Sequence, residues 1–129
     1  MAEIKSFRDL DVYQAGLSEA KKIFVVTKLF PSEAKFSLIS QIRRCSRGTT
    51  ALIAEAWARR KYVASFEHKL DEALGEANET QSWLDHALLC DYITREQHGE
   101  MDDKWQHIGA MINPMIQNSE SFCRAFNKR

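Results

Sequence analysis

Five arginines and a single glutamate fall within residues 41–60, QIRRCSRGTTALIAEAWARR. A guanidinium group presents a planar fork of donors that fits a carboxylate or a phosphate through two hydrogen bonds. Two uses of this segment therefore stay open. The arginines can form ion pairs that fix neighbouring helices, or they can contact the phosphates of a nucleic acid.

Arg44 and Glu55 are the candidates for structural ion pairs. Bidentate arginine–carboxylate pairs suit a partly buried interface between helices and help to set its register. The candidate carboxylates for the arginines of this segment are Glu55 and three acids further along the chain: Asp71, Glu72 and Glu79. We expect such pairs to contribute to assembly before any ligand is bound.

The remaining basic residues form a candidate nucleic-acid-binding patch: Arg43, Arg47, Arg59, Arg60 and Lys61. Residues 33–61 carry seven Lys or Arg against two Glu, a balance of +5, whereas residues 62–104 carry three against eleven acids, a balance of −8. The formal net charge of the chain is zero. The basic segment favours a polyanion, the acidic one repels it, and the two can also pair between copies of the chain.

The histidines and cysteines indicate no catalytic or metal site. None of the four histidines has a glutamate three residues before it, and no two lie three or four residues apart, so the usual helical metal patterns are absent. No glycine-rich phosphate loop and no GxSxG motif is present. Cys45 falls on an apolar helical stripe, which favours a core position over a nucleophile. We therefore expect no enzyme activity, no metal and no cofactor.

The cysteines and the N-terminus predict a cytoplasmic protein. Three cysteines, an odd number without a CxxC motif, favour reduced thiols. The opening MAEIKSFRDLD has no apolar segment, so no signal peptide is expected. The apolar runs are shorter than the roughly 20 residues of a membrane helix, so no membrane association is expected.

Apolar residues recur at the helical period through four segments, which are joined by very short connections. We expect helices over residues 10–30, 33–60 and 62–90, and a fourth that follows Thr94. Long helices with short connections pack as antiparallel neighbours. The sequence thus predicts an all-α protein, an antiparallel up-down-up-down four-helix bundle in one domain that spans residues 1–129.

Local signals refine these boundaries. Pro31 ends the first helix, and Ser32 is the expected N-cap of the second. Thr94 and Gln97 have the spacing of a capping box. Pro114 lies inside the fourth helix and is expected to kink it.

Trp57 and Trp83 fall outside the main apolar stripes of their helices. Large aromatic side chains in such positions are typical of interfaces. They therefore favour self-association of the chain.

The segment FPSEAKFSLISQIRRCSRGTTALIAEAWARR resembles the signature region of the four-helix-bundle family named for the 23S ribosomal RNA intervening sequence. The family pattern has a Leu-x-x-Gln-Ile-Arg-Arg block, which matches residues 38–44, and an Ile-Ala-Glu motif, which matches residues 53–55. The opening FRDLDVYQAG also resembles the usual start of the family. Leu52, Ala56 and Glu76 depart from it, where asparagine, glycine and serine are usual.

The resemblance implies a bundle that assembles as a homo-oligomer, typically a pentameric ring, with no activity established for the family. It also implies RNA, another nucleic acid, or a nucleic-acid enzyme as partner. We therefore predict a non-enzymatic oligomeric adaptor associated with nucleic acid. The alternative is a protein-binding structural scaffold without nucleic-acid contact.

Overall fold

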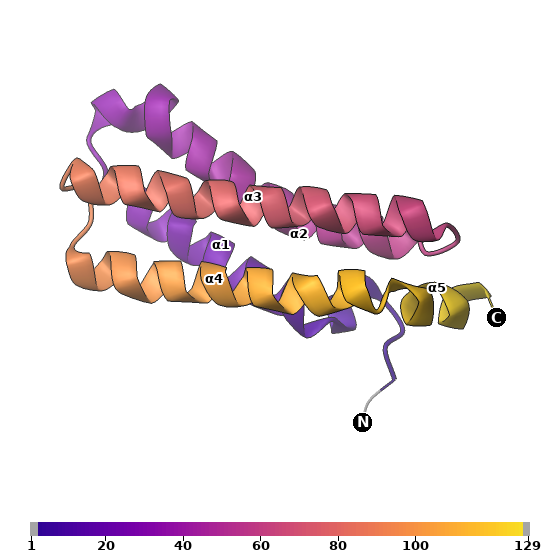
Figure 1. Ribbon diagram of the computed structural model, residues 1–129. Helices are drawn as coiled ribbons and strands as arrows, with labels where there is room; N and C mark the ends of the chain where they lie inside the picture. The colour runs from indigo at the N-terminus through magenta and orange to yellow at the C-terminus, as the bar shows by residue number, and fades with distance from the viewer. Residues whose placement is uncertain (1–2, 128–129) are drawn as a thin grey trace.

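The computed structural model describes residues 3–127, which form helices and no strands (Figure 1). The four long helices are α1 (Asp11–Thr27), α2 (Ser40–Ala58), α3 (Val63–Leu89) and α4 (Arg95–Gln117). Short helical elements are η1 (Phe7–Asp9), η2 (Ser32–Ala34), η3 (Lys35–Ile39) and the C-terminal α5 (Ser119–Asn127). The predicted all-α fold is confirmed.

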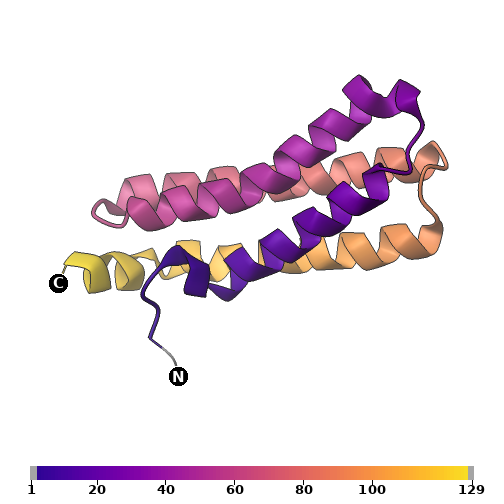
Figure 2. The same cartoon turned by 180° about the vertical axis from the view of Figure 1, so that it is seen from behind.

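Consecutive long helices run in opposite directions along the bundle. In Figure 1, α3 and α4 lie side by side in front of α2 and α1, and both ends of the described chain lie at the same end of the bundle. Figure 2 shows α1 lying obliquely between α2 and α4. The beginning of α2 diverges from α3 in both views.

The core consists of apolar side chains that recur every three or four residues on the inner faces of the helices. The largest fully buried apolar residues are Ile23, Ile42, Ile53, Phe66, Leu70, Leu84, Trp105, Ile108 and Ile112. Removing each such side chain from water stabilises the fold by about 2 kcal/mol before the entropy of ordering is subtracted. The predicted apolar stripes are therefore the faces that hold the bundle together.

The entry into the second helix differs from the prediction. Pro31 itself occupies the N-cap position of η2, and the side chain of Ser32 does not cap it. A single π-helical turn, η3, then precedes α2. Ala34, Leu38 and Ile42 are all buried at intervals of four residues, and a wider turn keeps such a series on one face better than an α-helical turn does.

The start of α4 agrees with its predicted capping box. The Thr94 hydroxyl accepts a hydrogen bond from the backbone N–H of Gln97 at 3.1 Å, and Gln97 Oε1 accepts one from the Thr94 N–H at 2.9 Å. These two bonds satisfy donors that a helix start otherwise leaves without partners. They fix where α4 leaves the short connection after α3.

α4 continues through Pro114 and ends three residues later, at Gln117. Asn118 donates to the Pro114 carbonyl from both its backbone N–H and its side-chain amide, each at 2.9 Å. This local bonding separates α4 from α5 at Asn118. Beyond Asn118, α5 continues past the end of α4 and contacts α3 (Figure 1).

Trp57, expected at an interface between copies, is covered by the chain itself. Only 9% of its surface is exposed, and its ring centroid lies 6.5 Å from that of Phe122 on α5. Trp83 is half-buried, and its indole N–H donates to Glu79 Oε2 at 3.0 Å. The expectation for Trp57 fails because the sequence pattern does not reveal that α5 covers this position.

Candidate nucleic-acid interface

The five predicted phosphate-binding residues lie at two separate places on the molecule. Arg43 and Arg47 lie on the first half of α2, whereas residues 59–61 form the turn between α2 and α3. At 1.5 Å per residue, the sixteen residues from Arg43 to Arg59 span about 24 Å along the helix. The structure therefore contains two basic places rather than one continuous patch.

Arg43 and Arg47 converge on the ring of Phe24 from α1. Their guanidinium carbons lie 4.7 and 5.4 Å from the ring centroid, and the ammonium of Lys28 lies 4.6 Å from it. We call these four residues the Phe24 cluster. It brings three cations from two helices onto a single aromatic ring.

Hydrogen bonds hold Arg43 in this place. Its Nε donates to Thr27 Oγ1 at 2.9 Å, and its Nη2 donates to the Phe24 carbonyl at 3.4 Å. The Thr27 hydroxyl donates in turn to the carbonyl of Ile23 at 2.7 Å. The guanidinium is thus positioned by neutral groups, which leave its charge uncompensated.

No carboxylate of residues 3–127 forms an ion pair with Lys28, Arg43 or Arg47. Contact with the face of an aromatic ring stabilises each cation by about 0.5–1 kcal/mol, and this offsets part of their mutual repulsion. A bound anion would offset it further. The cluster therefore has the charge and the donors of a phosphate-binding site.

Arg44 points to the other side of α2 and is already paired. Its Nη2 lies 2.6 Å from Glu79 Oε2, and its Nη1 lies 3.4 Å from Glu76 Oε2. Among residues 3–127, Glu55 forms no ion pair with an arginine; its Oε2 lies 3.8 Å from the ammonium of Lys69. Both residues thus link α2 to α3, but Arg44 and Glu55 belong to different ion pairs.

The turn between α2 and α3 uses Arg60 for local packing. Its Nε donates to the Trp57 carbonyl at 2.8 Å, and its guanidinium carbon lies 3.5 Å from the Trp57 ring centroid and 4.9 Å from that of Phe126. Arg59 is exposed and ends α2 through its backbone, and the Lys61 ammonium lies 5.6 Å from the Tyr62 ring. These contacts make the turn a weaker candidate for phosphate binding than the Phe24 cluster.

Phe24 and Lys28 were not among the predicted site residues. Lys28 follows Phe24 by four residues, as Arg47 follows Arg43, and this spacing places each pair on one helix face. That signal was available in the sequence. The register of α1 against α2, which brings the two pairs together, was not.

Cys45 is buried in the core, as predicted from its apolar stripe. Burial raises the pKa of its thiol from 9.0 to about 11, and a hydrogen bond from Thr80 Oγ1 to its Sγ at 3.1 Å opposes part of this rise. The thiolate is the reactive form of cysteine. Cys45 is therefore not a nucleophile at neutral pH.

We expect the free energy of unfolding to fall as the pH rises from about 9 to about 11. In this window the thiol of the unfolded chain loses its proton while the folded Cys45 keeps it, so deprotonation favours unfolding by about 2–3 kcal/mol. Below pH 9 both thiols are protonated and the contribution is fully present. Urea denaturation at several pH values should give a shallower decline for Cys45→Ala. Parallel declines would contradict the assignment.

Of the described helices, none combines the length and the apolarity that a membrane-spanning helix requires.

Comparisons with known proteins give one family and a similar solved structure. Residues 8–114 match the model of the 23S rRNA-intervening sequence proteins. The solved structure is a crystal structure of a protein with unknown function from the S23 ribosomal protein family of Bacteroides thetaiotaomicron. It has 33% sequence identity and a TM-score of 0.75, and the match covers 83% of this chain and 96% of that one. No functionally curated protein matches the chain.

Proposed function

The chain belongs to the 23S rRNA-intervening sequence protein family, and on this premise we propose that it is a non-enzymatic, homo-oligomeric adaptor that binds nucleic acid. The family name points to RNA as the first nucleic acid to test. The Phe24 cluster is the proposed contact with phosphates. This proposal replaces the single patch expected from the sequence with a smaller site between α1 and α2.

The observation that carries the proposal is the set of three cations on Phe24 that have no ion-pair partner in the described part of the chain. Guanidinium groups bind phosphate oxygens in pairs, and lysine adds a point charge. The half-buried Phe24 ring holds the cations close together before a ligand arrives. Such preorganisation lowers the cost of binding.

Self-assembly is the second part of the proposal, with five copies as the number that the family resemblance implies. Three large apolar side chains are almost fully exposed in the single chain: Leu29 at 84%, Phe36 at 80% and Leu89 at 79%. Exposed apolar side chains of this size are typical of surfaces that another chain covers. A ring would also repeat the Phe24 cluster around its axis and strengthen the field at a polyanion.

The test measures the affinity for single-stranded RNA by fluorescence anisotropy between about 50 and 200 mM salt. We expect Arg43→Ala with Arg47→Ala to weaken binding about tenfold or more at low salt, and to reduce the slope of log affinity against log salt by about 1.4 for two lost phosphate contacts. Both effects follow from counterions that are no longer released.

Arg44→Ala is the matched control, because it removes a neighbouring charge that is already paired with α3. We expect it to change the affinity much less than the double substitution does. Arg59→Ala with Arg60→Ala tests the α2–α3 turn in the same assay. An unmodified protein that ignores both RNA and DNA at low salt would overturn the nucleic-acid proposal.

The alternative is a protein-binding scaffold that makes no nucleic-acid contact. The exposed side chains of Leu29, Phe36 and Leu89 favour it, since they offer apolar area without phosphate chemistry. Sedimentation equilibrium of the purified chain measures assembly independently of RNA. An oligomer that binds no nucleic acid would support this alternative, whereas a monomer would contradict self-assembly.

A further inference from the structure

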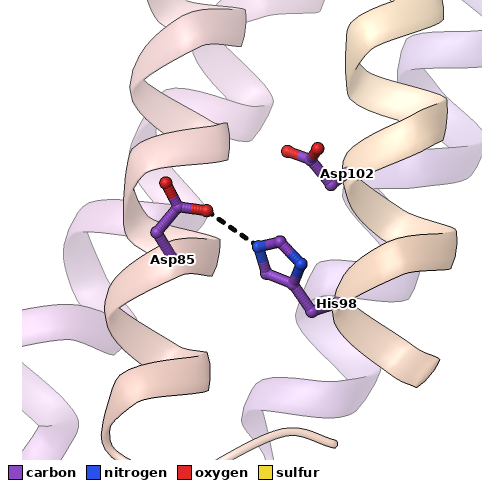
Figure 3. Close-up of side chains that lie close together, drawn as sticks. All are labelled: Asp85, His98 and Asp102. Atoms are coloured by element: carbon purple, nitrogen blue, oxygen red, sulfur yellow. Dashed lines mark hydrogen bonds and ion pairs between the residues drawn. The ribbon is translucent and has the colours of Figure 1, made fainter. Parts of the chain in front are cut away.

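Three potential metal ligands meet between α3 and α4, outside the Phe24 cluster. They are Asp85 from α3 and His98 and Asp102 from α4, and one ligand atom from each lies within 4.8 Å of the others. Figure 3 shows the imidazole of His98 turned toward Asp85, with the carboxylate of Asp102 on the same side of α4. The closest pair is His98 Nε2 and Asp85 Oδ1, at 2.8 Å.

Helix geometry explains this convergence. His98 and Asp102 are four residues apart, so they lie one above the other on the same face of α4. The same spacing places two metal ligands side by side in helical zinc motifs. Because α3 runs antiparallel to α4 across a short connection, Asp85 near the end of α3 faces this pair.

His68 and Glu72 provide a comparison within the same chain. His68 Nε2 lies 2.9 Å from Glu72 Oε1, and the ammonium of Lys69 lies 3.8 Å from the same carboxylate oxygen. This is an exposed histidine–carboxylate contact with the lysine ammonium beside it. At His98 the additional group is a second carboxylate, and no lysine or arginine of residues 3–127 forms an ion pair with Asp85 or Asp102.

We propose that Asp85, His98 and Asp102 bind a divalent transition metal ion, with Zn²⁺ as the reference ion. One imidazole nitrogen and two carboxylate oxygens form a mixed ligand set that suits zinc and its neighbours, whereas Mg²⁺ and Ca²⁺ prefer oxygen alone. A fourth position remains for water. The ion would neutralise the two carboxylates. This site is independent of the proposed nucleic-acid contact.

The ligand atoms need to rearrange modestly: the 2.8 Å pair of Asp85 Oδ1 and His98 Nε2 opens slightly, and the Asp102 ligand atom, which lies within 4.8 Å of them, moves closer. Zinc holds nitrogen and oxygen ligands at about 2.0–2.2 Å, so two ligands of a tetrahedral ion lie about 3.3 Å apart. Asp85 is 64% exposed, and its side chain can rotate toward the ion, whereas the less exposed His98, at 19%, stays in place. Solvent access to Asp85 also gives the ion an entry path.

A neighbouring amide supports the geometry. Gln81 Nε2 donates to Asp102 Oδ1 at 3.1 Å, which orients this carboxylate between the two helices. Metal ligands commonly have such outer hydrogen bonds, and losing one weakens metal affinity by about 10–100-fold. The sequence pattern does not reveal this site, because its ligands come from two helices and include only one histidine.

The test uses the tag-free protein after treatment with a chelator. We expect calorimetric titration with Zn²⁺ to give one ion per chain, and titration with Co²⁺ to give visible d–d absorption that saturates at the same ratio. Because the ion joins α3 to α4, Zn²⁺ should also raise the Tm. His98→Ala should abolish the absorption, and Asp102→Asn should weaken Zn²⁺ binding by at least about tenfold.

His68→Ala is the matched control and should leave stoichiometry and affinity unchanged. Asp85→Asn, a conservative change at an exposed position, keeps the test valid if His98→Ala fails to fold, as judged by circular dichroism. The proposal is overturned if the unmodified protein binds no stoichiometric Zn²⁺, or if binding persists unchanged in the properly folded His98→Ala or Asp85→Asn variant.

Discussion

Trp105→Ala should lower the free energy of unfolding by about 4 kcal/mol, because it removes the largest fully buried side chain of the bundle. The indole lies on α4 and belongs to the central apolar cluster. Its loss removes apolar area from the core and leaves a cavity that long, packed helices cannot close completely. Urea denaturation followed by circular dichroism measures the change at a fixed protein concentration, since assembly adds to the apparent stability.

Trp105→Phe distinguishes the effect of ring volume on the free energy of unfolding from the effect of the indole N–H. The indole N–H is buried and has no hydrogen-bond partner among the described residues. An unsatisfied buried donor costs about 1–3 kcal/mol, so its removal offsets part of the lost ring area. We expect the phenylalanine variant to lose less than half of what the alanine variant loses. Equal losses would mean that the N–H is satisfied in solution.

The long helices and the residue at which α4 begins could be predicted, because the sequence patterns that indicate them are local. Apolar residues at steps of three and four define the core faces, and Ile42 and Cys45 are buried as this pattern requires. The Thr94–Gln97 capping box is complete within four residues. The π-helical turn was missed because it depends on how Ala34 and Leu38 pack against the rest of the bundle.

The candidate sites depend on contacts that no local pattern reports. Arg43 and Arg44 are adjacent in sequence, yet one contacts Phe24 of α1 and the other contacts acids of α3. Only the rotation of α2 between its neighbours decides this difference. The meeting of Asp85 with His98 has the same origin, because it requires the register of α3 against α4.

The contact between α1 and α2 depends on the absence of a side chain at Gly16. A Cβ atom at this position would lie 2.6 Å from Thr50 Cγ2, closer than real Cβ contacts allow. Thr50 cannot turn away easily, because its hydroxyl donates to the Arg47 carbonyl at 2.9 Å and the residue is buried. The two helices therefore pack tightly at a point where α1 has no Cβ.

Gly16→Val should destabilise the protein by about 3 kcal/mol, since overpacking forces the helices apart or the side chains off their rotamers. Gly16→Ala should be milder, because its clash is opposed by a gain in helix propensity of about 1 kcal/mol. Gly75→Ala on α3 is the matched control: no atom lies within 4 Å of its added Cβ, so it should stabilise the protein. Chemical denaturation measures all three variants.

Thr50→Ser provides the decisive background for this series. Serine keeps the hydroxyl that bonds to Arg47 and removes the methyl group that a Cβ at Gly16 would meet. In the Thr50→Ser background, we expect the effect of Gly16→Ala on the free energy of unfolding to change from destabilising to stabilising, because only the gain in helix propensity remains. If Gly16→Ala costs the same with Thr50 and with serine at this position, the close approach of α1 to α2 at this point is refuted.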